Sequence, residues 1–130
     1  MYSLSSLVPR PSPFVPFSYF RRMKTPADSL TVMTELVHPN HTNILGNLHG
    51  GQLLYWMDIC SAIAATKHTH KTVVTASVDN VSFQNPIRLA DLVTIHSKVV
   101  RCFKTSMEVH IEVFAEYRSE EHTSELQSTQ

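Results

Sequence analysis

Residues 52–68, QLLYWMDICSAIAATKH, decide the fold that the rest of the sequence has to form around them. Between Gln52 and Ala65 the only charged side chain is Asp58, and the alanines favour a helix. Because this helix is apolar on nearly every face, nearly every face has to be buried. We therefore expect a sheet that wraps around a single central helix.

Asp58 is the first candidate for chemistry, because an ionised carboxylate on a buried helix is costly unless a partner pairs with it or a reaction uses it. A desolvated aspartate can act as a general base or as a nucleophile near neutral pH. It can equally be a structural side chain that is bonded to backbone amides or to a partner subunit. The pattern alone leaves both interpretations open.

The loop before the helix carries a second group of candidates. Gly50 and Gly51 let a ligand approach the backbone, and the N–H groups of the first helical turn can hold a developing oxyanion, although paired glycines also occur simply as turns. Asn47 can orient a water or satisfy the geometry of its turn. His49 is a candidate for acid–base chemistry, but most single loop histidines are solvated, and we expect His49 to be one of these.

The segments that flank the helix have the alternation typical of strands. The predicted strands span Leu30–Val37, Thr72–Phe83, Leu92–Cys102 and Ser106–Tyr117. In the second strand the apolar positions change parity around Asp79 and Asn80, which predicts a bulge or bend there. Tight connections between the later strands imply antiparallel pairing. The sequence therefore predicts an α+β domain whose antiparallel sheet curls around one helix.

The composition limits the possible functions. The chain has 130 residues, 42% of them hydrophobic, which suits one domain with a sizeable core. Its 11 basic residues balance 11 acidic ones, so nothing indicates a nucleic-acid binder. No apolar run approaches the ~20 residues that a membrane span needs, and we expect a soluble, cytoplasmic protein without membrane contact.

The residues that most often bind metals have no suitable spacing. Cys60 and Cys102 lack CxxC spacing and are expected to be reduced thiols, and Cys60 lies on a different helical face from Asp58. His68 and His70 form a His-x-His pair with no cysteine or acid nearby. We therefore expect no metal and no cysteine-dependent mechanism.

Both ends of the chain differ from its middle. Residues 1–26 contain five of the seven prolines, so they can form neither a helix nor a central strand, and we expect a solvated extension. Their basic residues would also suit a mitochondrial presequence, although the prolines disrupt the amphipathic helix that such sequences use. From Arg118 the chain reads RSEEHTSELQS, which resembles the in-frame translation of a common sequencing adapter. We therefore expect a domain over residues 27–117, and residues 118–130 as a non-native tail on a natural sequence cut off near Tyr117.

Three motifs together resemble a known family. They are PNHTNILGNLHGGQLLYWMDICSAIAA (39–65), TVVTASVDNVSFQNPI (72–87) and TSMEVHIEV (105–113). In this order they are similar to the hotdog-fold acyl-CoA thioesterases, in particular the brain-type cytosolic acyl-CoA hydrolases and their bacterial relatives. The resemblance runs from about Leu30 to Tyr117.

The resemblance implies a fold, a reaction and a set of roles. Five antiparallel strands would wrap a long helix. Two protomers would form a homodimer, alone or within a higher oligomer, and each active site would draw on both protomers. The reaction would be the hydrolysis of fatty acyl-CoA to a fatty acid and coenzyme A without a cofactor. Asp58 would activate water or attack the thioester carbonyl, and Asn47 of the opposite protomer would position nucleophile or substrate. The Gly51 N–H would polarise the thioester oxygen, with Gly50 allowing close approach. Asn80, Ser82 and Phe83 would line the acyl and pantetheine tunnel, and Arg88, Lys98, Arg101 and Lys104 are candidates for the coenzyme A phosphates.

Two departures from the family pattern leave other functions open. The family has a fifth strand after the position of Tyr117, and in its sheet that strand lies between the strands expected here at Ser106–Tyr117 and Thr72–Phe83. In this chain the tail stands in its place. We therefore expect these two strands to lack a partner on that side and the core to be open there. His41 stands where relatives often have an acid. The alternatives are a non-catalytic acyl-CoA-binding module, a hotdog dehydratase that uses His49, or an inactive fragment. Asp58 together with Asn47 favours the thioesterase.

Overall fold

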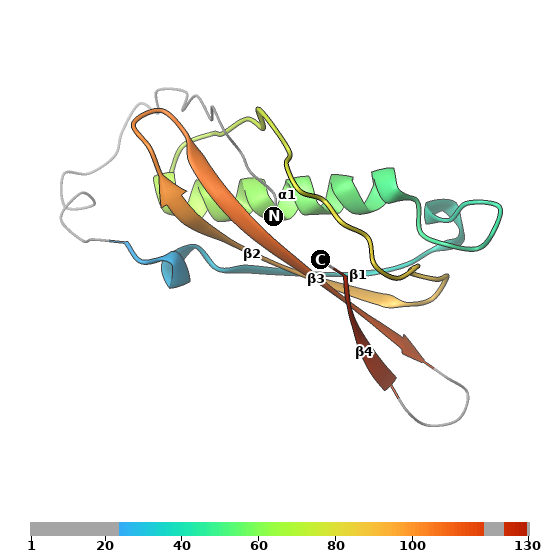
Figure 1. The fold of residues 1–130 in the computed structure, drawn as a ribbon. Coiled ribbons are helices and arrows are strands. Elements are labelled where there is room, and N and C mark those ends of the chain that lie inside the picture. The colour runs from blue at the N-terminus through green and yellow to red at the C-terminus, as the bar shows by residue number, and fades with distance from the viewer. Residues whose placement is uncertain (1–23, 119–123, 130) are drawn as a thin grey trace.

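A computed structural model describes residues 24–118 and 124–129 of the chain (Figure 1). One long helix, α1 (Gly50–Thr69), lies on one side of an antiparallel sheet. The strands are β1 (Thr31–Leu36), β2 (Leu92–Cys102), β3 (Met107–Arg118) and β4 (Ser124–Thr129), and two 3₁₀ turns, η2 (Pro26–Ser29) and η3 (Pro39–His41), flank β1. This arrangement confirms the predicted α+β fold with one central helix.

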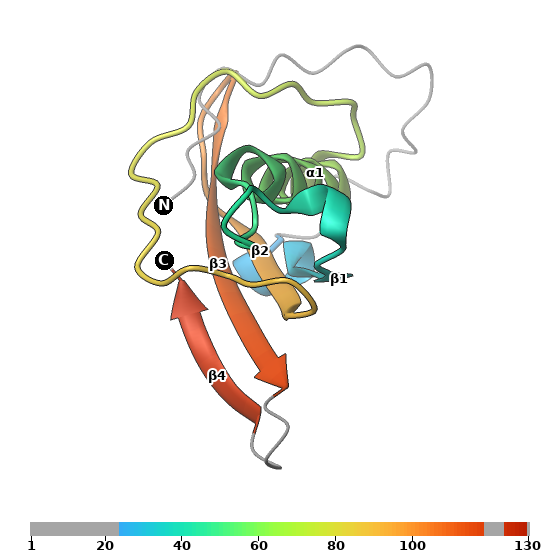
Figure 2. The same cartoon turned by 90° about the vertical axis from the view of Figure 1, so that its right-hand side faces the viewer.

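The sheet has the order β1-β2-β3-β4, with every neighbouring pair antiparallel. The pairing of β1 with β2 runs from Thr31 opposite Ser97 to Leu36 opposite Leu92, and β2 continues through a tight turn into β3. The register shifts between Val99 and Arg101, near the turn. Seen along α1, these strands curve beneath the helix (Figure 2). The predictions for β1, α1, β2 and β3 are therefore confirmed.

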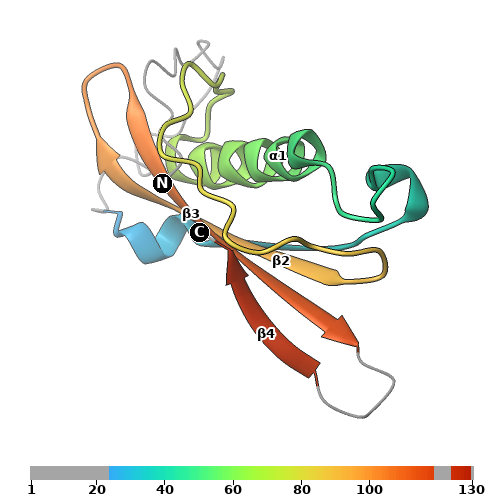
Figure 3. The same cartoon turned by 45° about the vertical axis from the view of Figure 1, so that its right-hand side comes forward.

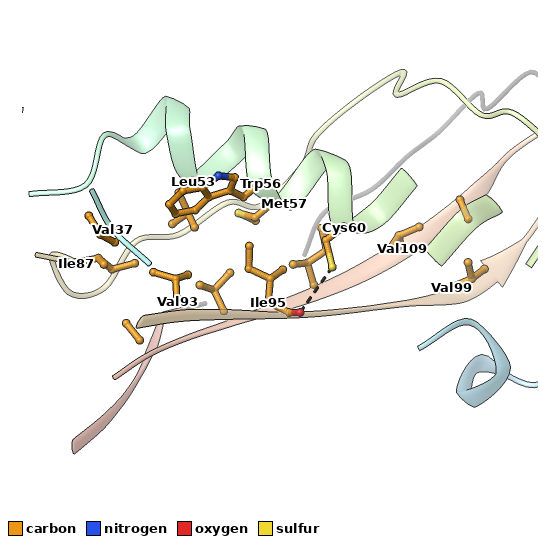
Figure 4. Packing of buried hydrophobic residues seen from close by; sticks show 14 of the residues in the cluster. Val37, Leu53, Trp56, Met57, Cys60, Ile87, Val93, Ile95, Val99 and Val109 are labelled. Atoms are coloured by element: carbon orange, nitrogen blue, oxygen red, sulfur yellow. Dashed lines mark hydrogen bonds between the residues drawn. The ribbon is translucent and has the colours of Figure 1, made fainter. Parts of the chain in front are cut away.

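The core lies between α1 and the inner face of this sheet (Figure 4). Because side chains alternate along a strand, Val93, Ile95 and Val99 of β2 all point to the helix and are buried. They meet the buried side chains Leu53, Trp56, Met57 and Cys60 of α1. Burying each such large apolar side chain stabilises the fold by about 1.5–3 kcal/mol.

The segment Thr72–Phe83, predicted as a strand, is not part of the sheet. It runs along α1 in the opposite direction to the helix, so that Thr75 contacts Asp58 and Phe83 lies beside Gly50. In Figure 2 it lies beyond β3, on the side away from β1. The prediction failed on two points. The even-numbered apolar positions Val74, Ala76 and Val78 are exposed instead of facing the core, and a strand also needs a neighbouring backbone, which the described residues do not offer here.

The predicted bend within this segment is present. Asn80 has a φ of 54°, in the left-handed region that asparagine tolerates better than most residues. Before the bend the odd-numbered positions Val73 and Ser77 are half-buried, and the even-numbered Val74 and Val78 are exposed. The segment therefore turns its odd-numbered side chains towards α1.

Part of the stretch that we expected to lie outside the fold pairs with the sheet. β4 lies antiparallel to the end of β3, from Val113 opposite Thr129 to Arg118 opposite Ser124. An edge strand can form through its backbone alone, so the polar sequence gave no sign of it. Among the described strands none pairs with Met107–Glu112 on this same edge. Residues 1–23 are outside the described part of the chain, so most of the proline-rich extension remains a prediction.

No helix in the described ranges is both long and apolar enough to cross a membrane.

Candidate active site

The carboxylate of Asp58 has a polar partner across from α1. Asp58 is half-buried, and the Thr75 hydroxyl donates a hydrogen bond to its Oδ1. The bond holds the carboxylate towards residues 72–83 instead of towards the sheet. The structure thus shows a carboxylate that is oriented by a side chain from outside its own helix, which is compatible with both the catalytic and the structural interpretation.

Thr75 is a site residue that sequence reasoning missed. It lies in the stretch TVVTASV, where a threonine is an ordinary strand residue. The one available signal is parity, because Thr75 shares the odd-numbered face with Val73, which packs against the core. Asp58 is the only charged side chain between Gln52 and Ala65 of the helix. A hydroxyl that faces this helix from the segment after it could therefore have indicated the pair of Thr75 and Asp58.

The first turn of α1 offers backbone donors. The N-cap residue, His49, makes no side-chain capping bond, and the helix dipole places partial positive charge at this end. A Cβ added to Gly51 would meet nothing within 4 Å, and one added to Gly50 would lie 3.9 Å from the Phe83 ring. Space for a ligand therefore exists next to Gly51, and Phe83 borders it at Gly50.

Gly51 and Asp58 lie on the same side of α1 but two turns apart. Seven residues at 1.5 Å each separate them by about 10 Å along the helix axis. A single substrate atom cannot contact both groups. A row of substrate and water atoms is needed to connect the Gly51 amide with the Asp58 carboxylate within one protomer.

The loop that carries Asn47 lies beyond the N-terminal end of α1 (Figure 3). The Asn43 Oδ1 accepts hydrogen bonds from the backbone N–H groups of Leu45 (2.9 Å) and Asn47 (3.2 Å), and Gly46 has a φ of 75° that the turn requires. The backbone of Asn47 also forms a bridge with Arg88. The structure thus brings Asn47 and Arg88 together, while Asp58 lies more than two turns into the helix.

The other predicted binding residues are divided between two ends of the molecule. After the bend at Asn80, the chain carries Ser82, Phe83 and Arg88 near the N-terminal end of α1. These three residues and Asn80 are all exposed. Lys98, Arg101 and Lys104 are exposed at the end of β2 and in the following turn. Lys98 points away from the helix, and Arg101 pairs with Glu108 at 3.9 Å. The four cations predicted for phosphates therefore do not form one cluster within the protomer.

The cysteines and the His-x-His pair lie apart from Asp58. Cys60 faces the sheet, where its Sγ lies 3.2 Å from the Ser97 Oγ, and burial raises the pKa of its thiol. The Cys102 Sγ lies 3.1 Å from the His68 Nε2 at the other end of α1. Burial raises the pKa of the Cys102 thiol, and burial followed by the nearby Lys24 charge lowers the pKa of His68. No three metal-binding side chains gather anywhere in the described ranges.

Residues 45–121, more than half of the chain, match the family model described as the Thioesterase superfamily. The chain belongs to this superfamily. It is 43% identical over 89 residues to the acetyl-coenzyme A thioesterase of Rattus norvegicus. The aligned region covers 68% of this chain and 16% of the rat protein. The chain thus spans about a sixth of the length of that relative.

Solved structures show the hotdog fold for this superfamily member. The hexameric hotdog-fold thioesterase of Campylobacter jejuni is 33% identical, with a TM-score of 0.72 over 75% of this chain and 73% of that one. An acyl-CoA hydrolase of Staphylococcus aureus, solved with butyryl coenzyme A, coenzyme A and its disulfide, is 31% identical, with a TM-score of 0.70 over 83% of this chain and 65% of that one. Its solved alanine variants replace an aspartate, a threonine 17 residues after it and an asparagine 15 residues before it.

Proposed function

We propose that this protein hydrolyses acyl-CoA thioesters to a free fatty acid and coenzyme A, without a metal or redox cofactor. Membership of the Thioesterase superfamily supports the reaction class. The named relative acts on a coenzyme A thioester, and the Staphylococcus aureus hydrolase was solved with butyryl coenzyme A. The substrate is therefore an acyl-CoA, with coenzyme A as leaving group.

The hydrogen bond from Thr75 to Asp58 is the observation that carries this proposal. The two residues are 17 positions apart, which is the spacing between the aspartate and the threonine replaced in the Staphylococcus aureus hydrolase. The same pair of residue types at the same spacing is in hydrogen-bond contact here. We assign Asp58 as the catalytic carboxylate and Thr75 as the residue that orients it.

The spacing along α1 supports a water-mediated reaction. In a row from the Asp58 carboxylate through a water and the thioester carbonyl to the Gly51 amide, the hydrogen bonds, the approach distance and the C=O bond sum to about 10 Å. Asp58 takes a proton as the water oxygen bonds to the carbonyl carbon, and the Gly51 N–H stabilises the oxyanion. The C–S bond then breaks, and the departing thiolate takes up the proton. Direct attack by Asp58 would leave the Gly51 amide too far from the oxyanion.

An asparagine completes the site, and the spacing favours Asn43 for this role. In the Staphylococcus aureus hydrolase the replaced asparagine precedes the aspartate by 15 residues, and in this chain that position is Asn43. Asn47, the asparagine first assigned to this role, precedes Asp58 by 11 residues. Asn43→Asp keeps the Oδ1 acceptor that holds the loop but removes the amide donor, so it should lower turnover without unfolding the loop. Asn47→Ala provides the comparison.

We further propose that the active protein is a homodimer, alone or within a higher oligomer, in which each loop approaches the partner's Asp58. The loop lies beyond the end of α1 in its own protomer, and Ile44 and Leu45 at its tip are 102% and 77% exposed. The Campylobacter jejuni thioesterase is hexameric. Arg88 is well placed for coenzyme A phosphates near this loop. The unbridged cysteines fit a reducing, cytoplasmic compartment.

The decisive test is thioester hydrolysis, measured as thiol release from a panel of short to long acyl-CoA substrates. Asp58→Asn, which keeps size and removes charge, should lower kcat at least about 100-fold, because general base catalysis contributes at least that much. Asp79→Asn, on the exposed part of segment 72–83, is the matched control and should retain native rates. Equal rates for native protein and Asp58→Asn would refute the assignment. Coenzyme A binding without turnover in the native protein would instead indicate a binding module.

A further inference from the structure

A thiol and an imidazole that the proposed reaction does not use meet at the C-terminal end of α1. The Cys102 Sγ, at the end of β2, lies 3.1 Å from the Nε2 of His68 in the last turn of the helix. Figure 1 shows the turn between β2 and β3 beside this end of α1. Cys102 is exposed, and His68 is half-buried. A thiol that a small molecule can reach is therefore in hydrogen-bond contact with an imidazole.

The surroundings of His68 favour its neutral imidazole. The Lys24 ammonium donates hydrogen bonds to the carbonyl groups of Lys67 and His68, so a positive charge lies at this end of the helix. Burial, followed by this charge, lowers the pKa of His68, and Asp28 opposes the effect. Burial raises the pKa of the Cys102 thiol. Both groups are therefore uncharged near pH 7, and we assign the Nε2 of His68 as the acceptor of the thiol proton.

Basic side chains outnumber acidic ones around this pair. Three segments meet here, residues 24–28, 66–71 and 101–108. Their basic side chains are those of Lys24, Lys67, Lys71, Arg101 and Lys104, and their acidic ones are those of Asp28 and Glu108. Glu108 lies 3.9 Å from Arg101. Because an excess of one charge raises the local concentration of oppositely charged molecules, this end of α1 attracts anions.

We propose that Cys102 and His68 form a site of thiol–disulfide exchange with small disulfides that carry negative charge. The Cys102 Sγ attacks one sulfur of the disulfide while the His68 Nε2 takes the thiol proton. A new S–S bond joins Cys102 to one half of the disulfide, the original S–S bond breaks, and the other half leaves as a thiolate that takes up the proton. Cys102 is oxidised and the departing half is reduced to a thiol, so the disulfide is the only oxidant needed. The exchange uses neither Asp58 nor acyl-CoA, so it does not rest on the proposed function.

The role of His68 is tested by the rate at which the protein forms a mixed disulfide with oxidised glutathione, with mass spectrometry locating the glutathionyl group. Cys60, which is 0% exposed, should stay unmodified and thereby reports that the fold is intact. His68→Gln should slow the reaction of Cys102 at least about tenfold near pH 7, because general base catalysis contributes at least that much. The matched control is His70→Asn, a change at the left-handed C-cap of α1 where asparagine is well tolerated, and it should react at the native rate.

The role of the positive charge is tested on the native protein with three disulfides. Coenzyme A disulfide carries phosphates, oxidised glutathione carries carboxylates, and cystamine is a cation. Each rate is divided by the rate of the same reagent with the chain unfolded in urea, which removes differences in intrinsic reactivity. Both anionic disulfides should then react at least about tenfold faster than cystamine at low salt, and added NaCl should reduce the difference. An advantage for only one of the two would support the proposal and identify phosphates or carboxylates as the recognised groups.

Three results would each overturn the proposal. The first is cystamine reacting as fast as both anionic disulfides, and the second is His68→Gln reacting as fast as the native protein. The third is a native protein in which Cys102 forms no mixed disulfide with either anionic reagent.

Discussion

The two long sides of α1 are held in different ways. On the side that faces the sheet, Cys60 and Trp56 are 0% and 5% exposed and pack against strands that are hydrogen-bonded along their length. On the other side, the extended segment 72–83 contacts the helix through separate points, chiefly Thr75 at Asp58 and Phe83 beside Gly50. The comparison teaches that apolar packing makes the helix stable, while the less packed side leaves its carboxylate accessible for chemistry.

The largest expected effect is on stability, from a change on the sheet side. Ile95 is 0% exposed, and Ile95→Ala should lower the free energy of unfolding by about 3 kcal/mol, because a cavity remains where the side chain packed. Val74 on the open side is 52% exposed, and Val74→Ala should change this free energy by less than about 0.5 kcal/mol. Urea unfolding followed by circular dichroism measures both. Similar losses for the two variants would show that the two sides are packed alike.

A smaller effect concerns pH and the C-terminal end of α1, where the two sides meet. The pKa of His68 is lowered by burial and by Lys24, so the unfolded chain binds this proton more readily than the folded one. Stability should therefore be full above about pH 6.5, the usual histidine pKa, and should fall as the pH decreases towards the lower pKa of the folded state. His68→Gln should flatten this part of the stability curve. A curve for His68→Gln that matches the native one would contradict the assignment.

The smallest effect on the fold comes from labelling the cysteines, which compares the accessibility of the sheet side of α1 with that of the protein surface and leaves the fold intact. Cys60 on the sheet side is 0% exposed, and Cys102 is exposed. A thiol reagent should therefore modify Cys102 alone in the native protein and both cysteines in denaturant. Mass spectrometry of the native protein and of Cys102→Ser gives the count. Rapid labelling of Cys60 under native conditions would mean that the helix separates from the sheet.

How much the sequence predicts follows the same division. β2 and β3 are foreseeable because they place apolar residues at alternate positions against the core, and α1 because a long alanine-rich apolar run favours a buried helix. β1 is foreseeable from its bounds alone, because its apolar residues Val32 and Leu36 are exposed. The segment 72–83 has the alternation but no neighbouring backbone, and β4 has the neighbour but no alternation, so both expectations differ from the structure.

The candidate site divides in the same way. Asp58 is foreseeable because a charge on an apolar helix is conspicuous in any sequence. Thr75 and Asn43 are polar residues in polar or strand-like surroundings, and their significance depends on which atom they contact in three dimensions. The sequence pattern reports the burial of β2 and β3 well, and it reports single hydrogen bonds across the fold poorly.

The most direct test of the account is the turnover of two variants at Thr75, because the account assigns catalysis to a carboxylate that this hydroxyl orients. Thr75→Val removes the hydroxyl at nearly constant shape, and Thr75→Ser retains it. A hydrogen bond to a charged group is worth about 1.5–3 kcal/mol, so Thr75→Val should lower kcat for butyryl-CoA about 10- to 100-fold at nearly unchanged unfolding free energy. Thr75→Ser should remain within about threefold of the native rate. A native rate in Thr75→Val, with Asp58→Asn inactive, would show that Asp58 acts without this orientation and would contradict the account.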